Sequence, residues 1–193
     1  MFLSVCITFF FLLTPFFVLT VFLSLTADEN AAARRRLAVR TTLAVLVVTF
    51  VLYFFGQAIF DIFGITLDAF RIGAGSLLFL SAVNLVGSAK APAAGEGDVS
   101  VVPLAIPVAV GPATTGAILV MGAEGADPSE RLVGLAALGT AVLALGALLY
   151  LSSPVERLLG KQGLSILTKL TGLVLAALSA QIVFTGIKNF LDL

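Results

Sequence analysis

The sequence predicts an all-α membrane protein with six transmembrane helices. Of its 193 residues, 60% are hydrophobic and 11% are charged, whereas a soluble domain has about 25% charged residues. The apolar residues fall in runs of about twenty, which is the length that crosses a hydrocarbon core. Runs such as Leu43–Phe55 lack the alternation of barrel strands. We therefore expect helices, which satisfy their backbone groups internally in lipid.

Short polar segments separate six apolar runs, and one of these segments divides the chain into halves. The predicted spans cover residues 2–26, 38–60, 70–88, 100–122, 132–151 and 164–187. The mid-chain segment 89–99 is rich in small residues and contains proline and glycine, so we interpret it as a cytoplasmic linker. It joins a first repeat, residues 1–88, to a second, residues 100–193. The first run has no basic residue before it, which favours a retained helix over a signal peptide.

The distribution of lysine and arginine predicts the orientation. Eight of the eleven basic residues follow the first, third and fifth spans, including the cluster Arg34–Arg36. Because cytoplasmic loops are enriched in basic residues, both termini are expected outside a multi-pass protein of the cell membrane. We interpret the cluster as a topology signal in preference to a lipid head-group site.

The two halves match weakly when the sequence is shifted by 97–98 positions. Pro15 then aligns with Pro112, Tyr53 with Tyr150, and every predicted span with another span. Three crossings per half invert the second half relative to the first. Inverted repeats are a frequent transporter architecture in which the solute binds near the midplane.

The first span of each half is interrupted by proline. Thr14 and Pro15 lie inside the first run, and the segment 102–116 contains Pro103, Pro107, Gly111 and Pro112. An interior proline removes one helical hydrogen bond, and the freed groups are tolerated only within protein or beside a wet cavity. A helix start and free carbonyls would suit the carboxylate and ammonium of a small zwitterion. The alternative is an ordinary kink, with threonine hydroxyls bonded to the preceding turn.

These breaks, with two deep polar residues of the third and sixth spans, define the candidate substrate-binding residues. They are Thr14, Pro15, Val18, Asn84, Gly111, Pro112, Ala113, Thr114, Thr115 and Gln181. Asn84 and Gln181 have an alternative role as helix–helix hydrogen-bonding groups.

The sequence lacks the residue types that catalysis, metal binding and ion coupling usually require. The sequence has no histidine and one cysteine, Cys6, so we expect neither an enzyme, a metal site nor a cofactor. The zero net charge gives no indication of nucleic-acid binding. No acidic residue lies inside a predicted span, which leaves a coupling ion without an obvious ligand.

Three segments in the same order and spacing resemble the MarC family of bacterial and archaeal membrane proteins. They are VPLAIPVAVGP (102–112), FGITLDAFRIGAGSLLFLSAV (63–83) and GLSILTKLTGLVLAALSAQIVFTGI (163–187). The resemblance covers nearly the whole chain. It implies six helices, a relation to the LysE-type exporter superfamily, and transport of small neutral amino acids such as alanine, glycine, serine or threonine.

The first span departs from the family pattern, which commonly reads DP-x-GN-x-P before FLSLT. Here Thr14, Phe17, Val18 and Thr20 replace the acid, glycine, asparagine and second proline, and Ala113 replaces a glycine after the GP motif. If those polar groups bind a substrate or coupling ion, this member carries another solute, couples differently or does not transport.

We therefore predict a transporter of small neutral amino acids, with the bilayer and a small-molecule substrate as its partners. A homo-oligomer is compatible with this interpretation. Two alternatives remain open, namely a transporter of another small neutral solute and a membrane scaffold without transport.

Overall fold

The computed structural model describes residues 2–87, 109–124 and 127–192, and these residues are helical throughout apart from short connections. The helices are α1 (Phe2–Leu12), α2 (Pro15–Leu25), α3 (Ala31–Phe63), α4 (Leu67–Val86), α5 (Pro112–Glu124), α6 (Pro128–Tyr150) and α7 (Ser152–Phe190). No β-strand occurs in the described ranges. The predicted all-α class is confirmed.

Five stretches of the described chain are long and apolar enough to cross a membrane. They are α1 with α2, the segment Ala31–Gly56 of α3, α4, α6 and α7. The 13 residues of α5 extend only about 20 Å at 1.5 Å per residue, short of a hydrocarbon core of about 30 Å. Much of the predicted fourth span, 100–122, and the whole linker 89–99 lie outside the described residues.

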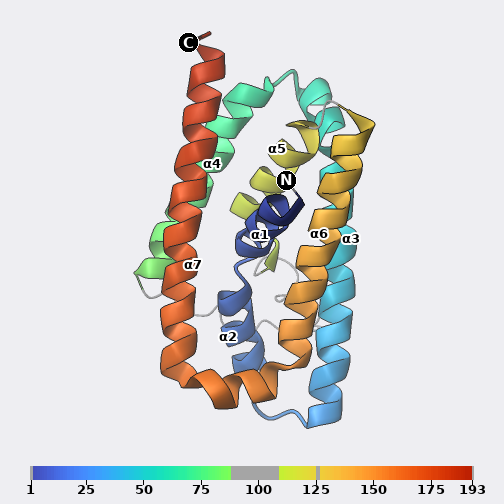
Figure 1. The fold of residues 1–193 in the computed structure, drawn as a ribbon, viewed down its shortest axis with the longest axis vertical. Coiled ribbons are helices and arrows are strands. Elements are labelled where there is room, and N and C mark those ends of the chain that lie inside the picture. Colours follow the sequence, from blue (N-terminus) through green and yellow to red (C-terminus); the bar gives the residue numbers. More distant parts are fainter. Residues whose placement is uncertain (1, 88–108, 125–126, 193) are drawn as a thin grey trace.

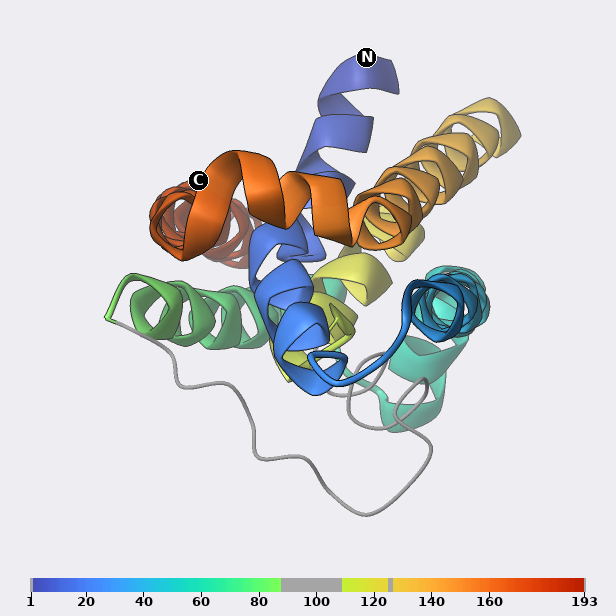
Figure 2. The ribbon, with the colours of Figure 1, turned by 90° about the horizontal axis from the view of Figure 1, so that it is seen from below.

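Four long helices surround three short ones. Figure 1 shows α4 and α7 side by side, with α3 and α6 across the molecule and α1, α2 and α5 between the two pairs. Seen from below in Figure 2, α2 occupies the centre of this arrangement. α5 packs against both α3 and α4, while α1 packs against α6 and α2 against α7. The short helices therefore occupy the middle of the bundle.

The lower end in Figure 1 contains the α2–α3 connection and the start of α7. Asn30 caps α3 by accepting a hydrogen bond of 2.9 Å from the Ala33 N–H. Arg34 then donates to the Ser153 hydroxyl at 3.0 Å and to the Thr26 carbonyl at 2.7 Å. This guanidinium joins the α2–α3 connection to α7.

The polar segment 153–163, between the fifth and sixth predicted spans, is helical on both sides of Gly160. Gly160 has φ 63° and ψ 175°, a conformation that glycine adopts without steric cost. The residues before it lie across the lower end of the molecule, and those after it run toward the C-terminus (Figure 1). A single glycine therefore turns α7 from the lower end of the molecule into the bundle.

Glycines at the helix contacts allow α5 to sit between α3 and α4. A methyl group added at Gly116 of α5 would come within 2.7 Å of the Ala74 Cβ on α4. One added at Gly56 of α3 would come equally close, 2.7 Å, to the Leu119 carbonyl oxygen of α5. Small residues allow this backbone approach in membranes, where lipid tails provide no hydrophobic force between helices.

We expect Gly116→Leu to destabilise the protein by about 1–3 kcal/mol, because the larger side chain overpacks the α4–α5 contact. Thermal unfolding in detergent measures the change. Gly73→Leu is the matched control, since nothing lies within 4 Å of a Cβ at Gly73 on the same α4. Equal losses of melting temperature in the two variants would contradict this account of the packing.

Candidate functional site

The first transmembrane stretch is broken between α1 and α2 at Thr14. This residue has φ 46° and ψ 55°, the left-handed conformation that β-branched residues rarely adopt. Its N–H donates to the Phe11 carbonyl at 2.9 Å, and its own carbonyl accepts from the Val18 N–H at 3.0 Å. Pro15 is the first residue of α2, where a proline needs no N–H partner. The predicted interruption is therefore a separation into two short helices.

A hydroxyl from α5 compensates for this break. In an unbroken helix the Leu12 carbonyl would accept the N–H of Phe16, four residues later. Here it accepts the Thr114 hydroxyl at 3.0 Å. Thr114 is 6% exposed and Leu12 is 1% exposed, and an unpaired buried carbonyl costs about 1–3 kcal/mol. The last residue of α1, before the first break, thus meets a residue that follows the second break.

The second break is described from Ala109 onward. Residues 109–111 precede α5, which begins at Pro112, and the Gly111 carbonyl accepts the Thr115 N–H at 2.8 Å. The first turn of α5 presents its N-terminal end to the middle of the bundle, where a helix carries a partial positive charge.

A cavity of about 200 Å³ lies between the two breaks. Thr14 and Phe17 line it from the first break, and residues 111–114 line it from the second. The remaining lining residues come from α4 and α7: Leu78, Ser81, Asn84, Leu85 and Leu175. None of these side chains is charged, so the polar groups that line the cavity are hydroxyls, one amide and backbone groups.

The structure gathers six of the ten candidate residues around this cavity. These are Thr14, Asn84, Gly111, Pro112, Ala113 and Thr114. Pro15 and Val18 are buried beside it, and Thr115 is half-buried in the first turn of α5. None of these last three is a lining residue. A substrate-binding role for all ten stays a prediction.

Gln181 is placed elsewhere. It lines a second cavity of about 180 Å³, together with Thr8, Arg71, Glu124 and Thr185. Within the described residues no cluster of three or more histidine, cysteine, aspartate or glutamate side chains could hold a metal ion.

Sequence reasoning missed the lining residues Phe17, Leu78, Ser81, Leu85 and Leu175 as site residues. Ser81 carried a usable signal, because it precedes Asn84 by three positions and residues so spaced share a helix face. Leu78 and Leu175 carried none, since leucine is common throughout the apolar spans. Only the packing of α4 and α7 shows which leucines face inward.

Helices of membrane-spanning length, packed through glycines and broken beside a cavity, define a polytopic integral membrane protein. A family model described as MarC family integral membrane protein matches residues 1–191. The chain belongs to the MarC family.

Relatives in bacteria and archaea are about a third identical to it over the aligned residues. A UPF0056 membrane protein of Aquifex aeolicus is 32% identical over 155 residues, covering 74% of this chain and 72% of the relative. The UPF0056 membrane protein MJ1677 of Methanocaldococcus jannaschii is 35% identical over 159 residues, 76% of each chain. The Escherichia coli protein YhcE is 28% identical over 153 residues, 74% of this chain and 71% of the relative. No solved structure matches the chain.

Removing the Thr114 hydroxyl should leave the Leu12 carbonyl unpaired. We expect Thr114→Val to destabilise the protein by about 1–3 kcal/mol and Thr114→Ser, which keeps the hydroxyl, to destabilise it less. The control is Thr140→Val, because the exposed Thr140 hydroxyl donates only to the Ala136 carbonyl of its own helix. Unfolding curves in detergent distinguish them, and a Thr114→Val curve that matches the Thr140→Val curve would exclude this role of the hydroxyl.

Proposed function

We propose that the protein transports small neutral amino acids of the alanine, glycine, serine and threonine class across the cell membrane. The observation that carries the proposal is the cavity between the breaks, which Thr14 lines from one side and residues 111–114 line from the other. Transport requires a site near the bilayer midplane that two separately movable parts can enclose, and broken helices are a recurrent way to build one.

The dimensions and chemistry of the cavity support this solute class. Its volume of about 200 Å³ is below the range of about 300–1,000 Å³ typical of pockets for drug-sized ligands. A carboxylate suits the start of α5, where N–H groups and the helix dipole favour negative charge. An ammonium suits carbonyl and hydroxyl oxygens such as those of Thr14 and Ser81. Without a charged lining residue, the cavity favours a solute with no net charge.

Thr14 changes how the first half of the proposed site would recognise a solute. The family pattern places an acid at this position, and threonine supplies a neutral hydroxyl instead. In our proposal the ammonium of the solute is therefore held by oxygen dipoles and not by a fixed negative charge. The same replacement leaves transport uncoupled from any cation that the acid would bind.

We also propose six spans arranged as two inverted halves, α1–α4 with residues 1–88 and α5–α7 with residues 100–193, with both termini outside. The placement of the basic residues supports this orientation. Arg34, Arg35 and Arg36 begin α3 at the end of the molecule where α7 starts, and Arg157 and Lys161 flank Gly160 there. Cytoplasmic segments have such an excess.

Single-cysteine labelling tests the orientation. In a Cys6→Ala background, Asp192→Cys should react with a membrane-impermeant maleimide on intact cells, because it lies at the exposed C-terminal end. Ala27→Cys, exposed between α2 and α3, should react only after the cells are opened. The reverse pattern would require the opposite orientation.

Uptake by proteoliposomes tests the transport proposal. We expect purified protein to take up or exchange labelled alanine or serine, and Gly111→Leu to reduce the rate at least about tenfold because the added side chain fills the cavity. Gly73→Leu, whose new side chain meets nothing within 4 Å, is the control and should transport normally. A Gly111→Leu protein that transports at the control rate would remove the cavity from the pathway.

The two alternatives give different results in the same preparation. A transporter of another neutral solute would ignore alanine and serine, but would be stabilised by its own solute in a thermal-shift screen of small metabolites. A membrane scaffold would gain no stability from any solute and would co-purify with a constant partner.

A further inference from the structure

The second cavity carries charged groups that the first lacks. It is about 180 Å³ in volume and lies between α1, α4, α5 and α7. Arg71 and Glu124 bring opposite charges to it, while Thr8, Gln181 and Thr185 bring neutral polar groups. A small molecule in this space would meet a cation, an anion and hydrogen-bonding groups at the same time.

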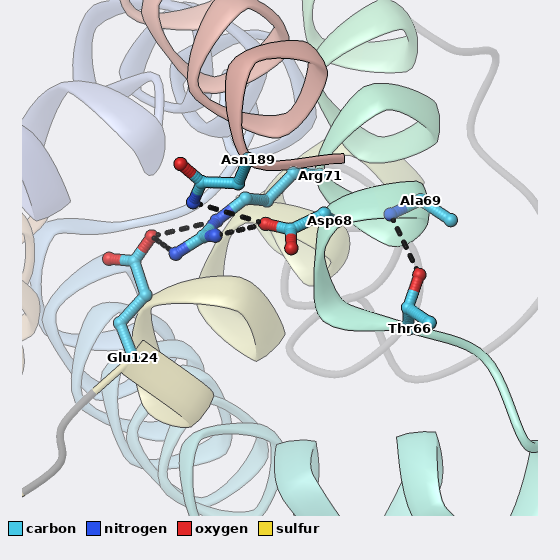
Figure 3. A network of polar contacts seen from close by, with 6 residues as sticks. All are labelled: Thr66, Asp68, Ala69, Arg71, Glu124 and Asn189. Carbon is cyan, nitrogen blue, oxygen red and sulfur yellow. Dashed lines mark hydrogen bonds and ion pairs between the residues drawn. The ribbon is translucent and has the colours of Figure 1, made fainter. Parts of the chain in front are cut away.

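Arg71 is the centre of an ion-pair network that joins three helices (Figure 3). Its Nε and Nη2 atoms donate to Oε1 of Glu124 at 3.2 and 2.8 Å, and its Nη1 donates to Oδ1 of Asp68. Asn189 of α7 donates to the same Asp68 oxygen at 3.3 Å. The guanidinium is thus oriented from α4, α5 and α7.

The position of this guanidinium is fixed by close helix packing. A methyl group added at Gly186 of α7 would come within 2.9 Å of the Arg71 Cβ and 2.8 Å of the Asp68 carbonyl oxygen. The Arg71 side chain is 11% exposed, whereas that of Glu124 is 43% exposed. A half-buried, held cation therefore faces a more exposed carboxylate.

The two cavities follow one another along the same helices. On α4 the second cavity is lined by Arg71 and the first by Ser81, ten residues and about 15 Å further along. On α7 Gln181 lines the second cavity and Leu175 the first. The hydrogen bond from Thr114 to Leu12 lies between them, since Leu12 lines the second cavity and Thr114 the first.

We propose that the second cavity is a binding site for the zwitterion of a small neutral amino acid, with its carboxylate on Arg71 and its ammonium on Glu124. The choice of ligand class rests on the proposed function. In this proposal the second cavity is the entrance to the first cavity from the end of the molecule that contains the α7 C-terminus. A zwitterion replaces the Arg71–Glu124 pair with two new ion pairs, so neither charge is left without a partner.

Solutes with a single charge or none cannot make this replacement. A guanidinium binds a carboxylate through two parallel hydrogen bonds, and both bonds from Arg71 to Glu124 now end on one oxygen, Oε1. Separating the pair without a substitute would leave Arg71 with the Asp68 ion pair alone and take the ion-pair partner from Glu124, which is unfavourable beside a partly buried guanidinium. The second cavity thereby selects molecules that carry both a carboxylate and an ammonium group. The uncharged first cavity then receives only such zwitterions.

Equilibrium binding of labelled alanine to the purified full-length protein tests this site apart from transport. We expect wild type to bind about two alanines per chain and Gly111→Leu, with the first cavity filled, to bind one. Adding Glu124→Gln to Gly111→Leu should weaken the remaining binding at least about tenfold, because the ammonium loses its charged partner. Glu130→Gln is the matched control, since Glu130 is exposed on α6 and does not line the second cavity.

Competition by single-charge analogues separates recognition from a purely structural role. Propionate lacks the ammonium and alaninamide lacks the carboxylate, so both should compete weakly in the Gly111→Leu protein. Glu124→Gln should lower the affinity for alanine and leave the affinity for propionate unchanged. Equal losses of affinity for both ligands would indicate a structural role of Glu124 and overturn the proposal. A Gly111→Leu protein that binds no alanine would also overturn it. The transport proposal is tested separately, by uptake into proteoliposomes with the wild-type protein.

Discussion

The bond from the Thr114 hydroxyl to the Leu12 carbonyl is the contact on which the centre of this molecule depends. Hydrocarbon offers no water to a backbone carbonyl released by a helix break, so α1 and α2 can separate only where protein supplies a donor. α5 supplies it from its first turn. The break in one half of the chain is therefore stable only in the presence of the helix start in the other half, and a cavity remains beside their meeting point.

The position of α5 depends on glycines at its contacts with the neighbouring helices. Gly116 and Gly56 bring its backbone against α4 and α3 at distances where any larger residue would collide. This approach keeps Thr114 within reach of α1. Small residues in these spans thus allow the Thr114–Leu12 hydrogen bond as well as the close helix contacts. A threonine side chain is short, so α5 has to lie close to α1 for its hydroxyl to reach the Leu12 carbonyl.

Two arginines join helices at opposite ends of the bundle. Arg34 joins α2, α3 and α7 at one end, and Arg71 joins α4, α5 and α7 at the other. The cavity between the breaks has only neutral lining residues. Charge at the bilayer centre is expensive. In our proposal the cavity beside Arg71 therefore recognises charged groups, and the proposed midplane site offers hydroxyls, an amide and helix ends.

The sequence by itself determined the helical class, the positions of most spans and the presence of a break at Thr14–Pro15, because hydropathy and proline act locally on the chain. It also indicated Gly111, Pro112 and Thr114 as a second unusual segment. It could not determine that Thr114 bonds Leu12, that Ser81, Leu78 and Leu175 face the same cavity, or that Gln181 belongs with Arg71 and Glu124 in another one. Those relations join residues far apart in the sequence, such as Leu12 and Thr114, which are 102 positions apart. In apolar spans only helix packing decides which side chains meet.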